Sequence, residues 1–261
     1  MKSIEEGYAH FLDIPVDSFH QKNIQLIETD NQRKPTWAKW VVPIWIIRFT
    51  ASPVCTVSTE YVDVAKQLVE KLNKLDILSP KLLEFAQMIH KENGGWNQRE
   101  IMIYKNNISV KRHGHKVEQL KQIDSHSRIL LNRFDGGVFV IRNEINDIVA
   151  YAGVKNKGII QEIAVKTDPT YQRKGMAQDV VSQAITAILD DGKIPTYIPD
   201  SLDNAASYLL AQKLGFDKVG EMIFWEYELP DWSGFIKESL LNKMKNRFIE
   251  KVLLAIPPYK R

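Results

Sequence analysis

The sequence of 261 residues lacks several features that mark common classes of protein. It has one cysteine, Cys55, so no disulfide can form within the chain, and nothing indicates an oxidising compartment. The most apolar run, residues 41–49, is interrupted by Pro43 and Arg48 and is too short to cross a bilayer. The first residues do not have the basic and apolar regions of a signal peptide. We therefore expect a cytoplasmic protein that is not held in a membrane.

A strong charge of one sign is also absent. Lys and Arg number 35 against 32 Asp and Glu, which gives a formal net charge of +3. A surface with so small an excess of positive charge does not indicate a nucleic-acid partner. The basic run Lys111, Arg112 and Lys116 is interpreted as a solvated face, with contact to a cofactor phosphate or an acidic partner as the alternative.

Candidates for a metal site or a nucleophile are few. His113 and His115 are spaced as a strand would place two ligands on one face, but no third ligand stands close in the sequence, so no metal site is predicted. Cys55 lies among Val54, Thr56 and Val57, which is typical of a small buried hydrophobic residue.

The most informative stretch is residues 158–177, which read GIIQEIAVKTDPTYQRKGMA. Residues 159–165 are apolar and rich in β-branched side chains, which predicts a buried strand. A helix is expected to open over residues 172–177, with one apolar face formed by Val180, Val181, Ala184, Ile185, Ile188 and Leu189. The first N–H groups of such a helix have no partner within it, so the turn favours an anion, typically a phosphate. Gly175 and Ala177 allow close approach, and Arg173 and Lys174 add positive charge.

The run IAVKTDPTYQRKGMA, followed downstream by NAASYLLAQKLGF, strongly resembles the GNAT superfamily of N-acetyltransferases. The closer match, through TDPTYQRKGMA and IPTYIPDSLDNAASYLLAQKLGF, is similar to the subgroup that includes zwittermicin A resistance proteins. The resemblance extends over residues 138–229. It implies an α+β fold in which a mixed, mostly antiparallel sheet is flanked by helices and two central strands splay apart to bind acyl-CoA.

The resemblance also implies which residues contact acetyl-CoA, the expected cosubstrate. The backbone of one splayed strand would bind the pantetheine arm and stabilise the oxyanion. The loop Q/R-x-x-G-x-G/A would hold the pyrophosphate, and an Asn before the next helix would also contact the cofactor. These positions are Ile163, Ala164 and Val165 on the strand; Gln172, Arg173, Lys174, Gly175, Met176 and Ala177 in the loop; and Asn204, for which helix capping is the alternative.

Two residues are candidates for proton transfer. Glu162 is a candidate base, since strand alternation places it opposite Ile163 and Val165, and a structural salt bridge or hydrogen bond is the alternative. Many family members carry a Tyr four residues before the Gly of the L-G-F signature, but this chain has Ala211 there. Tyr208, one helical turn earlier, is the substitute candidate acid, and packing against the sheet is its alternative role.

Three segments are predicted. Residues 1–98 form an N-terminal α+β accessory domain, residues 99–230 the acetyltransferase domain, and residues 231–261 an amphipathic helix and tail. Formation of a homodimer through this last helix is an open alternative.

Three local predictions concern the N-terminal half. Trp37, Trp40 and Trp45 are expected to pack in a core, with a substrate pocket as the alternative, and Thr59 is the expected cap of the helix over residues 60–72. Residues 99–113 are expected to form a hairpin that turns at Asn106 and Asn107.

The predicted function is transfer of an acetyl group from acetyl-CoA to a primary amine, directly within a ternary complex. The acceptor is a small amine or an amino group on an antibiotic-like molecule, and the sequence does not identify it. Direct transfer needs no side-chain nucleophile, and the sequence has no obvious Ser or Cys constellation. Two alternatives remain at this stage. One is an acyl-CoA-binding or sensing module with weak catalysis, suggested by Ala211, and the other is a protein acetyltransferase that recruits its Lys or N-terminal acceptor through the first domain.

Overall fold

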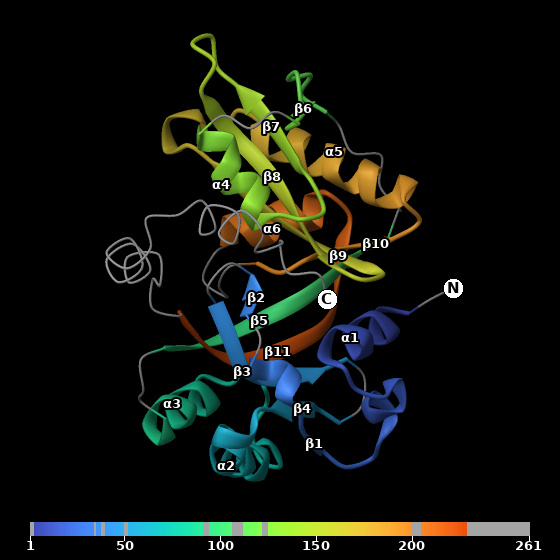
Figure 1. Ribbon diagram of the computed structural model, residues 1–261, viewed down its shortest axis with the longest axis vertical. Coiled ribbons are helices and arrows are strands. Elements are labelled where there is room, and N and C mark those ends of the chain that lie inside the picture. The colour runs from blue at the N-terminus through green and yellow to red at the C-terminus, as the bar shows by residue number, and fades with distance from the viewer. Residues whose placement is uncertain are drawn as a thin grey trace, which may run out of the picture.

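The chain forms an α+β structure in which helices cover both faces of one mixed, mostly antiparallel sheet, as the sequence predicts (Figure 1). The computed structural model describes residues 3–33, 35–37, 40–49, 52–90, 94–105, 112–121, 125–199 and 205–228. No helix among these residues is long and apolar enough to cross a membrane.

The sheet has eleven strands and follows the order β1-β4-β3-β11-β5-β10-β9-β8-β7-β6, with β2 paired to β3. Two pairs are parallel, β1 with β4 and β9 with β10, and the other described pairs are antiparallel. The strands are β1 (Gln25–Glu28), β2 (Pro35–Trp37), β3 (Trp40–Arg48), β4 (Val54–Val57), β5 (Gly95–Tyr104), β6 (Glu118–Gln119), β7 (Val138–Arg142), β8 (Ile148–Lys157), β9 (Ile160–Thr167), β10 (Ile194–Tyr197) and β11 (Phe216–Glu228).

The helices divide between the two faces of the sheet. One face carries α1 and α4, and the other carries α2, α3, α5 and α6, with α2 and α3 in the lower half of Figure 1 and α5 beside β7 and β8 in the upper half. We call the face with α1 and α4 the α1 face. The helices are α1 (Ile4–Leu12), α2 (Val62–Leu72), α3 (Pro80–Ile89), α4 (Ser125–Arg133), α5 (Met176–Asp190) and α6 (Ala205–Lys213).

Strand β5 shows how alternation assigns residues to these faces. Ile101 packs in the cluster around α1, whereas Met102 packs in the cluster around α5. The buried side chain of Gln98 points the same way as Met102, and its amide donates hydrogen bonds to the carbonyl oxygens of Ile77 and Ser79, at 2.5 and 2.9 Å. Odd-numbered residues of β5 from 97 to 103 therefore belong to the α1 face.

The sheet is strongly curved toward the α1 face. Four strands lie between β8 and β3 in the sheet order, so in a flat sheet these two strands would be about 24 Å apart, at roughly 4.8 Å per step. Instead, the ammonium nitrogen of Lys157 on β8 lies 5.8 Å from the ring centroid of Trp45 on β3. Such a contact requires the sheet to bend until its two halves face each other, so the α1 face is concave.

Helix α5 and the first domain's core largely match the sequence predictions. The predicted apolar stripe of α5 is buried at Val180, Val181, Ala184, Ile185 and Ile188, but Leu189 is exposed because it lies at the outer edge of the stripe. Cys55 is fully buried and burial raises the pKa of its thiol, as expected for an unreactive core residue. Trp45 is buried in the core, as predicted.

Two local predictions were wrong. The predicted hairpin over residues 99–113 cannot include Met102 and Ile103, because β10 and β11 already occupy both edges of β5 at these two residues. Helix α2 is not capped by Thr59, because residues 59–61 form a 3₁₀ turn and the α-helix starts only at Val62. The segment of residues 106–111 lies outside the described residues.

The division into domains remains a prediction. The strand pairing matters for it, because strands from both sides of the predicted boundary between residues 98 and 99 belong to the same sheet. Strand β5 runs continuously across the predicted boundary between residues 98 and 99. Strand β3 of the N-terminal segment pairs with β11 along nearly its whole length, so both segments contribute to a single sheet. The predicted amphipathic helix and tail, residues 231–261, lie outside the described residues.

The contact between α1 and β9 gives a stability prediction. A methyl group added at Gly7 would lie 2.4 Å from Cγ2 of Ile160, which is fully buried and cannot easily move aside. Gly7→Ala should therefore lower the free energy of unfolding by about 1–3 kcal/mol in urea titrations, the usual cost of overpacking. In a helix exposed at this position, the same change would raise stability by about 1 kcal/mol through helix propensity. A measured rise would contradict the packing of α1 on β9.

Candidate active site

The turn between β9 and α5 has the geometry of an anion site. After Thr167 the chain makes a short 3₁₀ turn, and α5 starts at Met176, within residues 172–177 where the sequence predicts a helix to open. Gly175 is the N-cap in the left-handed conformation, with φ of 82°, and Arg173 before it also has a positive φ of 62°. No side chain of the described residues caps α5. Its first backbone N–H groups are therefore available to an anion, which the helix dipole favours.

Strand β9 leads directly into this turn and is only partly paired on one side. It pairs with β10 from Ile160 to Ile163, and among the described residues no strand pairs with residues 164–167 on that side. On the other side, β8 pairs with β9 along its whole length. Ile163 is buried, and Ala164 and Val165 are half-buried. The backbone groups of this half of β9 therefore face a gap in the ladder between β9 and β10.

Residues 112–115 lie across the start of α5 and against the turn. The backbone N–H groups of His113 and His115 donate to the carboxylate of Asp179 at 2.8 and 2.9 Å, and Nδ1 of His115 lies 2.8 Å from the same carboxylate. Burial raises the pKa of Asp179, but these bonds outweigh it and lower the pKa overall. The ring of His113 lies so close to Gly175 that a Cβ there would be 2.2 Å from it. Only glycine fits this position.

The residues of the basic run, Lys111, Arg112 and Lys116, differ in their surroundings. Arg112 reaches α5, where its guanidinium donates to Thr186 at 3.2 Å and lies 3.5 Å from the side-chain oxygen of Gln183. Lys116 is exposed, as expected for a solvated face, and Lys111 lies outside the described residues. Among the described residues no group of three or more His, Cys, Asp or Glu is placed to hold a metal ion.

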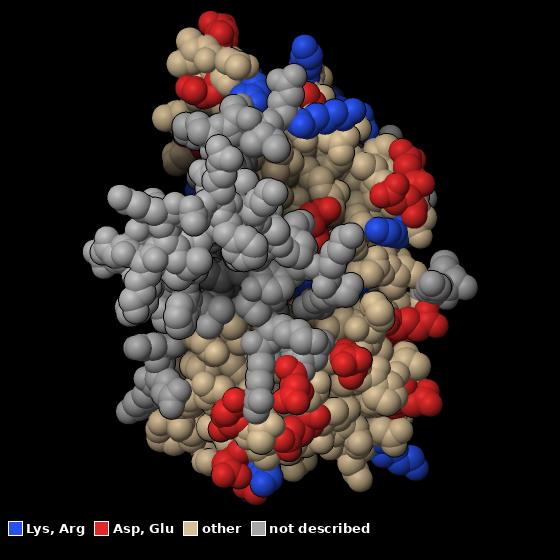
Figure 2. Space-filling view, viewed as in Figure 1, with Lys and Arg blue, Asp and Glu red and all other residues tan. Residues whose placement is uncertain are grey.

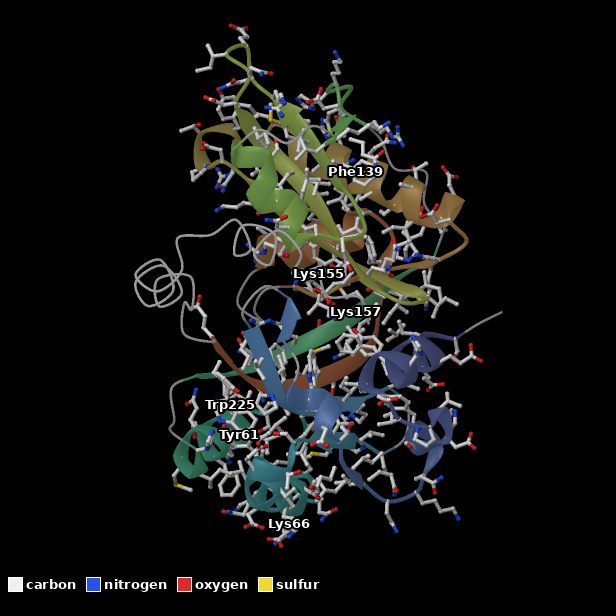
Figure 3. All side chains as sticks on the ribbon, viewed as in Figure 1. Tyr61, Lys66, Phe139, Lys155, Lys157 and Trp225 are labelled. Atoms are coloured by element: carbon white, nitrogen blue, oxygen red, sulfur yellow. The ribbon has the colours of Figure 1, made fainter. Side chains whose placement is uncertain are left out.

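Glu162 lies on the concave α1 face, held between two lysines from β8. Nζ of Lys157 is 2.6 Å from Oε2, and Nζ of Lys155 is 3.2 Å from Oε1. Figure 3 shows both lysines at the centre of the molecule, where the strands of its upper and lower halves meet. Burial raises the pKa of Glu162, but the charges and hydrogen bonds of the two lysines outweigh it and hold the pKa at about 2. A carboxylate this strongly stabilised has little tendency to take up a proton.

Lys157 is almost completely buried, with 4% of its side chain exposed. Its ammonium group lies 4.4 Å from the ring centroid of Phe11 and 5.8 Å from that of Tyr8, both on α1. These rings add cation–π attraction to the ion pair with Glu162. The N-terminal helix therefore helps to hold the charged pair on the central strands.

Tyr208 and Glu162 are not brought together on one face. Tyr208 is half-buried in α6 and packs against the cluster on the face opposite Glu162. Ala211, at the position where many family members have Tyr, is fully buried in the same cluster. Asn204 lies outside the described residues. The remaining predicted cofactor residues form one continuous path, from Ile163 along β9 to the turn at Gly175 and the start of α5.

The sequence interpretation missed several charged residues of the concave face. Lys155 and Lys157 were not recognised as partners of Glu162, although their alternation along β8 is a usable signal once β8 and β9 are known to be antiparallel neighbours. Glu226 on β11 and Arg99 on β5 were also missed. They lie far from Glu162 in sequence, and the curvature that brings these strands toward it leaves no local pattern.

Comparison with known families adds to this geometry. Residues 131–224 match the model of the GNAT acetyltransferase family, a segment that contains β7 to β10, the Gly175 turn, α5 and most of β11. The match supports the GNAT resemblance for this part of the chain. No curated protein matches the sequence.

Solved structures with similar folds include several acetyltransferases. A putative acetyltransferase of the GNAT family from Novosphingobium aromaticivorans is 18% identical, with a TM-score of 0.42, covering 52% of this chain and 66% of its own. A GCN5-related N-acetyltransferase-like protein from Streptococcus suis is 19% identical, with a TM-score of 0.42, covering 56% of this chain and 68% of its own. The chain thus spans about two thirds of the length of these structures.

The ion pairs of Glu162 predict how stability depends on pH. The pKa of Glu162 is lowered from 4.5 to about 2 in the folded state, so its contribution is complete above pH 4.5 and is lost as the pH falls toward 2. The loss should be on the order of 3 kcal/mol. Because pH 3 is still above the folded pKa, urea unfolding between pH 7 and pH 3 should show about 2 kcal/mol of this decline in the wild type.

Glu162→Gln should remove that decline and lower stability at pH 7 by about 3–5 kcal/mol, because it leaves two lysines without their carboxylate. Glu118→Gln is the matched control, since Glu118 forms an exposed pair with Arg142 and should contribute no more than about 1 kcal/mol. An unchanged pH dependence in Glu162→Gln would contradict the assignment.

Proposed function

We propose that the protein is an N-acetyltransferase that transfers an acetyl group from acetyl-CoA to a primary amine of a small molecule. The observation that carries this proposal is the continuity of β9 with the uncapped start of α5. The strand offers backbone groups beside a gap in the ladder, and it leads within a few residues to a glycine-capped helix N-terminus. One elongated ligand with a polar arm and a pyrophosphate fits both features.

The residues of this chain have distinct roles in the proposal. Backbone groups of Ile163, Ala164 and Val165 bind the pantetheine arm and stabilise negative charge on the thioester oxygen during attack. The loop of residues 172–177 holds the pyrophosphate through the N–H groups of α5 and the charges of Arg173 and Lys174. Acetyl-CoA supplies the activated acyl group, so no side-chain nucleophile takes part.

The contacts of Glu162 and Tyr208 bear differently on their candidate roles in proton transfer. For Glu162, the two lysine contacts favour the role of a structural ion pair over that of a base. Tyr208 remains the proposed acid, because it lies one turn before Ala211 on α6 and its side chain is only half-buried. The burial of Ala211 also favours a second candidate function, an acyl-CoA-binding module with weak catalysis, since the usual tyrosine is replaced by a core methyl group.

The charge distribution gives no support to a nucleic-acid acceptor. In the described part of the face shown in Figure 2, Lys and Arg are scattered while Asp and Glu gather toward the lower half, so this face has no continuous basic strip. The similarity to the zwittermicin A resistance subgroup suggests an antibiotic-like amine. A panel of small amines and a panel of Lys or N-terminal peptides, compared by CoA release, would separate a small acceptor from a protein acceptor.

Thermal unfolding tests the cofactor directly. Acetyl-CoA at about one hundred times its dissociation constant should add roughly 2.7 kcal/mol of stability. For a chain of this size the midpoint should rise by about 5–10 °C. Free CoA should act similarly and ATP should not. The absence of a rise with both acetyl-CoA and CoA would contradict the proposal.

Reversing the charges of Arg173 and Lys174 tests whether the loop of residues 172–177 binds the pyrophosphate of acetyl-CoA. Arg173→Glu with Lys174→Glu should weaken acetyl-CoA binding by at least about tenfold, because each cation contributes a charge-assisted hydrogen bond of about 1.5–3 kcal/mol. Both side chains are exposed, so the unliganded midpoint should change little. The matched control is Lys74→Glu with Lys81→Glu, two exposed lysines near α2 and α3. Equal affinity in the two double variants would rule out the loop as the pyrophosphate site.

A further inference from the structure

The buried and half-buried glutamates on the strands of the sheet differ in their partners. Glu162 is paired with two lysines, Glu100 lies 2.8 Å from Nζ of Lys218, and Glu221 contacts both Lys218 and Arg48, at 2.7 and 2.5 Å. Glu226 is the exception. Among the described residues no Lys, Arg or His nitrogen lies within ion-pair distance of it, and its carboxylate accepts one hydrogen bond, from Nδ2 of Asn97 at 3.1 Å.

Glu226 belongs to the concave α1 face. On β11 it follows Phe224 by two residues, so strand alternation places both side chains on the same side. Phe224 stacks on Trp45 with ring centroids 5.0 Å apart, and Trp45 is the ring that Lys157 approaches from β8. Glu226 is therefore next to the region where the two halves of the sheet face each other.

The charges around Glu226 come from three other strands. Arg99 on β5 and Lys155 on β8 attract its negative charge, and Glu162 on β9 repels it. Burial has the largest effect, and it raises the pKa of Glu226 despite the two cations and the bond from Asn97. Glu221, on the same strand, shows the opposite: burial raises its pKa, but the contacts with Lys218 and Arg48 outweigh burial and lower it. Within the described part of the chain, Glu226 thus lacks the direct cation that Glu221 has.

We propose that Glu226, with Asn97 beside it, binds the primary ammonium group of the acceptor. An ammonium group has three N–H donors and a full positive charge. It could therefore supply the cationic hydrogen-bond partner that this half-buried carboxylate does not have among the described residues. The proposal rests on the proposed acetyl transfer and adds to it where the acceptor's amino group is held. Binding requires ionised Glu226, so it weakens as the pH falls through the raised pKa of this carboxyl group.

A carboxyl-¹³C NMR titration tests the proposal without an identified acceptor. The full chain is labelled with ¹³C at the glutamate carboxyl carbons, and the variants Glu226→Gln and Glu221→Gln assign the two signals by their loss. The probe is ethanolamine, which is protonated at pH 7. Choline is the control, because it carries the same charge and hydroxyl group but has no N–H donor.

The Glu226 signal should shift saturably with ethanolamine and only weakly with choline, while the Glu221 signal stays in place. In a pH titration the Glu226 signal should also have its midpoint above that of Glu221. A Glu226 signal that does not respond to ethanolamine, or that responds equally to choline, would overturn the proposal.

The acetyl-CoA thermal shift separates this proposal from the proposed function. Glu226→Gln should retain the full rise in midpoint with acetyl-CoA, because Glu226 is not part of the loop at Gly175. If the wild type shows no rise with acetyl-CoA, the proposed function fails, and the NMR titration still decides whether Glu226 binds an amine.

Discussion

The buried pair of Glu162 and Lys157 is the interaction on which the rest of the structure depends. Lys157 reaches from β8 to rings on α1 and β3, so the pair lies where the curved sheet closes on itself. Burying two charges is costly unless both are paired and hydrogen-bonded, and Lys155 and the surrounding rings supply the additional contacts. The pair thereby fixes the position of β9, the strand that leads to the Gly175 turn.

The two halves of β9 differ in how they are paired. Its first half is fixed by β8, β10 and the ion pair, whereas its second half is paired on one side only. A rigid strand with an open edge is suited to binding an extended ligand through backbone groups. The concave face beside it carries Glu226 and Asn97.

Local patterns in the sequence predicted most helices and strands, and the Gly175 turn. The stripe from Val180 to Ile188 identifies α5, because its spacing reflects a repeat within one element. The predicted hairpin over residues 99–113 does not account for Met102 and Ile103, because both residues pair with β10 and β11, which come about a hundred residues later. The contact of Lys157 with Trp45 was equally beyond prediction, since it depends on the curvature of the whole sheet. Contacts of this kind are set by tertiary structure rather than by local sequence.

Hydrogen exchange of backbone amides, with and without acetyl-CoA, tests the central claim most directly. The account predicts slower exchange in two separate segments, residues 163–165 of β9 and residues 175–178 at the start of α5, with no change in α2 or α3. Protection of both segments together would show one ligand extending from the strand to the helix N-terminus. Unchanged exchange in both segments, or protection confined to other parts of the chain, would contradict it.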